Sequence, residues 1–138
     1  MNAHIAALRK RLDAPVVPGS NAHLVKLQGE LADYFAGSLR RFSVPLSYRG
    51  TTFQQRVWEQ LLAIPYGETR SYEQLAIATG NPKAVRAVGH ANGLNRICIL
   101  IPCHRVINKD GRLGGYGGGL RRKQYLLEHE RANLGELV

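Results

Sequence analysis

The chain has 138 residues, of which 44% are hydrophobic, so it can bury a real core as one domain or as one domain with a small addition. Its 19 lysine and arginine residues outnumber its 10 acidic residues and give a net charge of +9. The cations recur along the chain, which favours nucleic acid as the partner over a membrane surface. Since the chain has no apolar run of about 18 residues and residues 1–12 lack a continuous apolar stretch, we expect neither a membrane span nor a signal peptide.

The cysteines indicate a reducing compartment. The chain has two, Cys98 and Cys103, and Cys98 lies inside an apolar run, 97–101, that is typical of a strand. Two cysteines so placed are poorly set for a disulfide. We therefore expect free thiols in a cytoplasmic protein that associates with the nucleoid by binding DNA.

The first part of the chain is expected to be a short helical lead-in. Residues 2–12 and 21–37 carry helix-like patterns, and the prolines and glycine of residues 13–19 separate them. A second break that contains a proline follows. We therefore expect a truncated N-terminal helical segment over residues 1–43 and a main domain over residues 44–138.

Two capping boxes mark helix starts in the main domain. Thr51 and Gln54 open one helix, and Ser71 and Gln74 open another, which Gly80 should close. Two short helices joined by a turn that contains glycine, within a basic domain, favour helix-turn-helix DNA binding.

A third helix is expected to have Asn81 as its cap and Pro82 at its first position, and to run to about Gly93. Its core-facing side carries Ala84, Val88 and Ala91, and its other side carries Arg86, Gly89, His90 and Gly93. Glycine costs about 1 kcal/mol in an exposed helix interior, so these glycines indicate a surface that a bulky partner approaches closely. Tight packing against another helix is the alternative.

The apolar run 97–101 ends at Pro102, which places Cys103 at the end of the expected strand, followed by His104 and Arg105. A thiolate is a nucleophile and a thiol is not, so a cysteine with basic neighbours at a turn is typical of a reactive thiol. An inert buried cysteine is the alternative, and it is the better interpretation for Cys98.

Two turns follow. Residues 108–111 end in Asp-Gly and predict a β-hairpin. Residues 114–119 are five glycines around Tyr116, which favours a loop that wraps a flat substrate, with a flexible surface loop as the alternative.

The last helix is expected to start at about Leu120. Arg121, Arg122 and Lys123 in its first turn oppose the helix dipole, so either phosphate contact or plain solvation explains them. Glu130 lies at the edge of the apolar face, where it either points inward at a histidine or stays on the surface.

Together these motifs resemble the O6-methylguanine-DNA methyltransferase family over about residues 44–131. The resemblance is carried by residues 50–58, Ser71 and Tyr72, residues 83–89, and residues 101–106, whose sequence is Ile-Pro-Cys-His-Arg-Val. It implies an α+β, mostly helical fold in which a short N-terminal segment precedes a winged helix-turn-helix-like alkyltransferase domain.

The resemblance implies a repair reaction that consumes the protein. A guanine alkylated at O6 flips out of duplex DNA, and Cys103 takes the alkyl group irreversibly. His104 acts through a water as the base for Cys103, and Glu130 orients His104. No cofactor is required.

The resemblance also implies roles for other residues. Tyr72, which could instead be a core aromatic, donates a hydrogen bond toward the leaving guanine. Arg86 enters the base stack, and Asn95 is a hinge between the recognition helix and the active-site strand. The remaining residues implied in DNA binding are Gly89, Gly93, Arg105, Tyr116, Gly117 and Arg121.

The chain departs from the family in its N-terminal part, which is too short for the β-sheet domain usual there, so it is either a compact member or a fragment. Some relatives bind zinc in that part, but only His4 and His23 stand here, and we expect no metal site. The glycines after Tyr116 indicate a pocket with room for alkyl groups larger than methyl.

Two other classes of protein stay open. One is a non-catalytic alkyltransferase-like lesion sensor or regulatory DNA-binding domain, which the presence of Cys103 disfavours. The other is a cysteine hydrolase, which the basic charge disfavours. We expect a monomer whose partner is double-stranded DNA with O6-alkylguanine, and O4-alkylthymine is a second candidate substrate.

Overall fold

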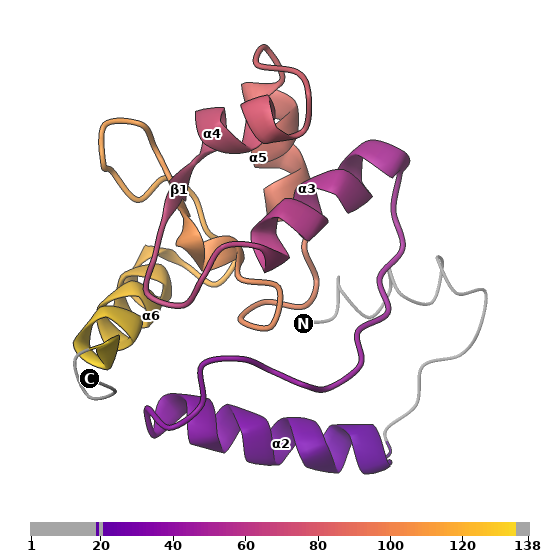
Figure 1. Ribbon diagram of the computed structural model, residues 1–138, viewed down its shortest axis with the longest axis vertical. Helices are drawn as coiled ribbons and strands as arrows, with labels where there is room; N and C mark the ends of the chain where they lie inside the picture. Colours follow the sequence, from indigo (N-terminus) through magenta and orange to yellow (C-terminus); the bar gives the residue numbers. More distant parts are fainter. Residues whose placement is uncertain (1–18, 20, 135–138) are drawn as a thin grey trace.

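The computed structural model describes residue 19 and residues 21–134 (Figure 1). The elements in chain order are α2 (Ala22–Phe35), α3 (Thr52–Leu62), β1 (Arg70–Ser71), α4 (Tyr72–Ala78), α5 (Val85–Gly93), the 3₁₀ helix η1 (Cys103–Arg105), β2 (Val106–Ile107) and α6 (Leu120–Ala132). This confirms the expected mostly helical α+β fold. Among the described residues, no helix has the length and apolar character needed to cross a membrane.

Both predicted capping boxes are present. In α3 the Thr51 hydroxyl accepts from the Gln54 backbone and the Gln54 side chain accepts from the Thr51 backbone, and Ser71 and Gln74 repeat this arrangement in α4. Gly80 follows the end of α4 with a φ of +93°, which glycine adopts without strain. The two starts thus follow from short-range sequence signals.

The start of α5 was predicted three residues too early. The helix begins at Val85, because Asn81 caps a separate turn: its side chain accepts from the Lys83 N–H and its carbonyl accepts from the Ala84 N–H. Its end at Gly93 is confirmed.

The core lies where α3, α4 and α5 meet (Figure 1). Val88 and Ala91 of α5 are buried, as the helical spacing predicted. The Trp58 indole packs against them from α3 and donates to the Ala91 carbonyl at 2.9 Å. This hydrogen bond fixes how α5 lies on the core, with its other side exposed.

The strand predicted over residues 97–101 is wrong. The segment is a turn in which the Ile101 N–H donates to the Ile97 carbonyl and Ile99 has a φ of +75°. A short apolar run can pack against a core either as a strand or as a turn, so its hydrophobic periodicity does not distinguish the two conformations. Asn95 holds the turn, donating to the Ile101 carbonyl at 2.9 Å and accepting from the Ile97 N–H.

The hairpin turn predicted around residues 108–111 forms: the Gly111 N–H donates to the Asn108 carbonyl at 2.9 Å and the Asn108 N–H donates to the Arg112 carbonyl at 2.8 Å, but in the described part of the chain no strand follows it. Strand β2 before the turn pairs in parallel with β1, with Arg70 beside Val106. This two-stranded pairing links the start of α4 to the segment that follows Cys103.

Helix α2, with Asn21 as its N-cap, falls within the pattern predicted over residues 21–37 and lies apart from α3–α5 along the lower edge of Figure 1. It contacts α6: His129 Nε2 lies 2.7 Å from the Tyr34 carbonyl oxygen. After the helix, Arg40 donates to the Asn133 carbonyl at 2.9 Å. The helix predicted over residues 2–12 lies outside the described residues, and the boundary at residue 43 stays a prediction.

Candidate active site

Cys103 lies at the start of η1, directly after the turn that Asn95 holds. Its side chain is buried against the core, and its N–H donates to the Ile101 carbonyl at 2.7 Å. The contact with Cys98 and burial both raise the pKa of the Cys103 thiol, so its sulfur keeps its proton near neutral pH. A nucleophilic reaction at this sulfur therefore needs a base.

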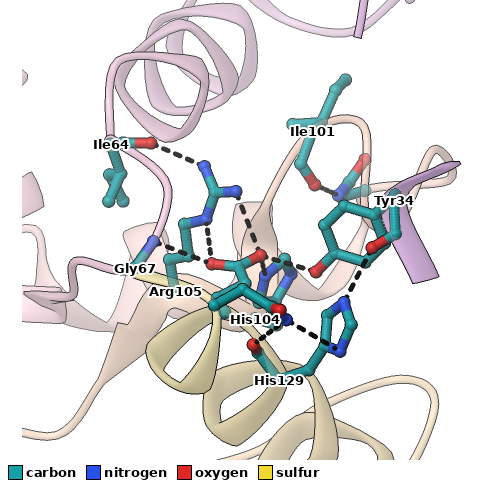
Figure 2. A network of polar contacts seen from close by, with 10 residues as sticks. Tyr34, Ile64, Gly67, Ile101, His104, Arg105 and His129 are labelled. Atoms are coloured by element: carbon teal, nitrogen blue, oxygen red, sulfur yellow. Dashed lines mark hydrogen bonds and ion pairs between the residues drawn. The ribbon is translucent and has the colours of Figure 1, made fainter. Parts of the chain in front are cut away.

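The neighbouring His104 is fully buried and is held by Glu130 from α6 (Figure 2). The distance from His104 Nε2 to Glu130 Oε2 is 2.7 Å. The inward orientation of Glu130, one of two open interpretations of the sequence, is therefore the one in the structure. This places an acid side chain directly behind the imidazole.

Four groups converge on the Glu130 carboxylate. Besides His104, the Tyr34 hydroxyl donates at 2.6 Å, the Gly67 N–H at 3.2 Å, and Arg105 from Nε at 2.8 Å and Nη2 at 3.0 Å. Burial raises the pKa of Glu130, but the hydrogen bonds from His104 and Arg105 outweigh burial and hold the pKa at about 2. Glu130 is thus a carboxylate, which only accepts hydrogen bonds.

The charge on Glu130 decides the tautomer of His104. Burial lowers the pKa of His104 and the contact with Glu130 only partly opposes it, so the imidazole is neutral near pH 7. Since Glu130 can only accept, His104 Nε2 carries the proton and Nδ1 carries a free lone pair. Nδ1 is buried and has no hydrogen-bond partner among the described residues. A neutral imidazole with an unused acceptor nitrogen can act as a base.

Arg105 does not lie where the DNA-binding prediction placed it. Its guanidinium is buried, forks onto Glu130 and donates from Nη1 to the Ile64 carbonyl at 2.7 Å. It also lies 5.6 Å from the centre of the Tyr66 ring. Arg105 therefore belongs to the Glu130 network, and a role for it in DNA binding stays a prediction.

Lys123, like Arg105, is buried, whereas its neighbours Arg121 and Arg122 are exposed. It is fully buried, and its ammonium donates to the carbonyls of Leu113 and Gly115. Burial lowers the pKa of Lys123 to about 8. Of the three cations in the first turn of α6, Lys123 therefore anchors the glycine-rich loop, and the other two remain for an anionic partner.

Tyr72 starts α4 and lies against the same loop. Its ring is 5.8 Å from Lys123 Nζ, and burial raises the pKa of its hydroxyl. Gly114 has a φ of +68°, and a Cβ there would lie 3.2 Å from the Tyr72 hydroxyl. Glycine at 114 thus lets the loop approach the tyrosine closely.

The exposed side of α5 carries Arg86, and a Cβ at Gly93 would meet open space. A Cβ at Gly89 would lie 4.0 Å from Tyr72, an ordinary contact. Close packing within the described chain therefore does not explain these two glycines. Nearby, Gly117 is exposed and Tyr116 packs partly against the core.

Sequence reasoning missed Tyr34 and the inward role of Lys123. Nothing around Tyr34 predicts its contact, because Glu130 is 96 positions away. Lys123 had one signal, a cation opposing the helix dipole, but that signal did not distinguish an inward from an outward side chain. Among the described residues, no three His, Cys, Asp or Glu side chains gather closely enough to hold a metal ion.

The chain is similar in sequence to proteins of one family. A family model for the DNA-binding domain of 6-O-methylguanine DNA methyltransferase matches residues 52–132. A methylated-DNA–protein-cysteine methyltransferase of Mycobacterium tuberculosis H37Rv is 60% identical over 103 residues, which are 75% of this chain and 62% of that protein. A constitutive one of Bacillus subtilis is 51% identical over 115 residues, 83% of this chain and 70% of that protein.

Solved structures of related proteins have a similar fold. The crystal structure of M. tuberculosis OGT in complex with DNA has a TM-score of 0.78 and 52% identity, covering 85% of this chain and 76% of that one. S. pombe Atl1 bound to damaged DNA with O6-carboxymethylguanine has a TM-score of 0.53 and 31% identity, covering 60% and 79%. The chain spans about 62% of the length of the mycobacterial relative.

Proposed function

The chain belongs to the O6-methylguanine-DNA methyltransferase family, and from this membership we propose that it repairs DNA by moving the alkyl group of O6-alkylguanine onto Cys103. The observation that carries the proposal is the buried pair of Glu130 and His104, with a free acceptor nitrogen on the residue next to Cys103. That arrangement supplies the base that a protonated thiol requires.

The proposed reaction is one displacement. His104 Nδ1 takes the thiol proton of Cys103 through a water, and the sulfur attacks the alkyl carbon. The sulfur–carbon bond forms as the bond from that carbon to guanine O6 breaks. The guanine then gains a proton and regains its normal form. A thioether has no good leaving group, so each molecule reacts once.

Glu130 supports this step electrostatically. Taking the proton makes His104 a cation, and the buried carboxylate 2.7 Å away stabilises that cation more than it stabilises the neutral ring. Arg105 and Tyr34 in turn hold the carboxylate in place. Both are positioning residues because they act through Glu130.

The leaving base and the DNA have candidate partners among other residues of the chain. Tyr72 is proposed to donate to the departing guanine, and the loop held by Lys123 to close over it. Arg86 is proposed to fill the space of the flipped nucleotide, with Gly89 and Gly93 allowing α5 close to the minor groove. Arg121 and the neighbouring Arg122, both exposed, are proposed to contact phosphates.

A single experiment tests the reaction. The protein is incubated with duplex DNA that carries O6-methylguanine, and the tryptic peptide of residues 97–105 is weighed. We expect one added methyl on Cys103 and no further activity. Tight lesion binding with an unmodified peptide would instead indicate a lesion sensor, and continued turnover a hydrolase.

Cys103→Ser is the matched control. The serine hydroxyl is far less nucleophilic than a thiolate, so transfer should vanish while DNA affinity stays nearly unchanged. If this variant also lost DNA binding, misfolding would explain the loss of transfer.

A further inference from the structure

The turn over residues 97–101 brings a second sulfur to the candidate nucleophile. Cys98 Sγ lies 3.9 Å from Cys103 Sγ, and both are free thiols. The expectation that their placement disfavours a disulfide assumed a strand, in which the chain would carry them apart. The left-handed conformation of Ile99 reverses the chain between them instead, so the sulfurs meet.

This conformation is costly for Ile99. A β-branched residue at a φ of +75° is rare and strained. The surroundings hold it there: Asn95 pins both ends of the turn, and Cys98 pairs with Ile101 in an isolated bridge. The contact between the sulfurs is therefore enforced by the fold around them.

We propose that Cys98 is a redox partner of Cys103, and that peroxide converts the two thiols into a reversible disulfide that blocks the nucleophile. A bond of about 2.05 Å requires the sulfurs to approach by about 2 Å, which side-chain rotation with a small shift of the turn can supply. The disulfide would close a loop over residues 98–103.

Peroxide would form the disulfide in two steps. The Cys98 sulfur is half-buried and so the more accessible, and contact with Cys103 lowers the pKa of Cys98 to about 6, so it attacks first. A sulfur–oxygen bond forms, the peroxide O–O bond breaks, and one water leaves after protonation. His104 then takes the proton of the Cys103 thiol as that sulfur attacks the Cys98 sulfenic acid, the sulfur–sulfur bond forms, and the proton leaves with the hydroxyl as a second water.

A disulfide leaves Cys103 recoverable, whereas oxidation of its sulfur beyond sulfenic acid does not. Without a neighbouring thiol, a sulfenic acid on Cys103 can proceed to irreversible sulfinic acid. A disulfide returns to two thiols with a thiol reductant. The pair would thus protect a sulfur that the proposed function uses only once.

The test follows the peptide of residues 97–105, which contains both cysteines between trypsin sites at Arg96 and Arg105. After treatment of the folded full chain with hydrogen peroxide, remaining thiols are blocked with N-ethylmaleimide. We expect the peptide to lose the mass of two hydrogens, to take up no maleimide, and to regain both thiols after dithiothreitol. A peptide with two blocked thiols, or with oxygen on Cys103 beside a blocked Cys98, would overturn the proposal.

Cys98→Ser is the comparison variant. Under the same treatment it should never lose two hydrogens and should accumulate irreversibly oxidised Cys103. The mass measurement does not depend on alkyl transfer, so the redox proposal and the proposed function can fail separately. If wild type and variant oxidised Cys103 to the same extent and equally irreversibly, Cys98 would have no such role.

Discussion

At the scale of single residues, the ionisation of Glu130 determines what His104 can do. A carboxylate accepts and cannot donate, so its contact with His104 leaves Nδ1 as the free acceptor. A protonated Glu130 would remove that constraint and the charge that stabilises the imidazolium. The donors around Glu130 therefore matter to the base although they do not touch it.

Tyr34→Phe tests whether a donor to Glu130 affects the base, because it removes one oxygen atom. The change removes the hydroxyl that donates to Glu130 at 2.6 Å and leaves the ring, so alkyl transfer should slow by about three- to tenfold. Without this hydrogen bond Glu130 is held less firmly and stabilises the His104 imidazolium less. The acid limb of the pH–rate profile should therefore shift to lower pH. Tyr125→Phe is the control, because that ring is 54% exposed. An unchanged pH profile in Tyr34→Phe would rule out a positioning role.

Acid should destabilise the fold through the same carboxylate. The folded pKa of Glu130, about 2, lies below its ordinary 4.5, so its stabilisation is complete above about pH 4.5 and is lost as the pH falls toward 2. The loss is roughly 3 kcal/mol. Urea unfolding at a series of pH values measures it. Glu130→Gln should flatten this part of the curve, and an equally steep curve in a folded Glu130→Gln variant would contradict the assignment.

At the scale of elements, α5 has one side fixed by the core and the other free. Trp58 and the buried Val88 hold the inner side, so side chains on the outer side can change without disturbing packing. Glycine there weakens the helix. The proposed approach of DNA to α5 gives a reason for keeping it.

Gly93→Leu tests whether DNA approaches the outer side of α5. A Cβ at Gly93 meets open space, so the fold should be unchanged or up to about 1 kcal/mol more stable. DNA affinity should nevertheless fall by about tenfold or more, as measured by fluorescence anisotropy. Gly29→Leu in α2 is the matched control, since a Cβ there is equally free, and it should leave DNA affinity unchanged. Equal effects of the two variants would show that α5 does not face DNA.

At the scale of the whole molecule, the site joins parts that are far apart in sequence. Helix α2 supplies Tyr34, η1 supplies His104, and α6 supplies Glu130 (Figure 2). Tyr34, which lies in the N-terminal segment, therefore belongs to the site together with residues of the main domain. The net charge of +9 acts at the same scale, because a positive field should draw DNA, the proposed partner, from a distance.

Binding to duplex DNA should accordingly weaken steeply with salt. Each phosphate neutralised releases counterions, so several contacts should give a fall in affinity of about a hundredfold or more between 50 and 200 mM salt. Replacing exposed Arg121 with Ala should weaken binding and reduce the slope by about one. Salt-independent binding would contradict a phosphate-contacting surface.

Short-range rules were enough to predict the capping boxes at Thr51 and Ser71, the buried side of α5, and the pairing of Cys103 with a neighbouring base. The packed fold was needed to see which cations face inward, that Tyr34 reaches Glu130, and that Cys98 meets Cys103. The difference lies in distance along the chain. Caps and helix faces depend on neighbours within a few residues, whereas burial, ion pairing and the reversal at Ile99 depend on what the rest of the fold packs against them.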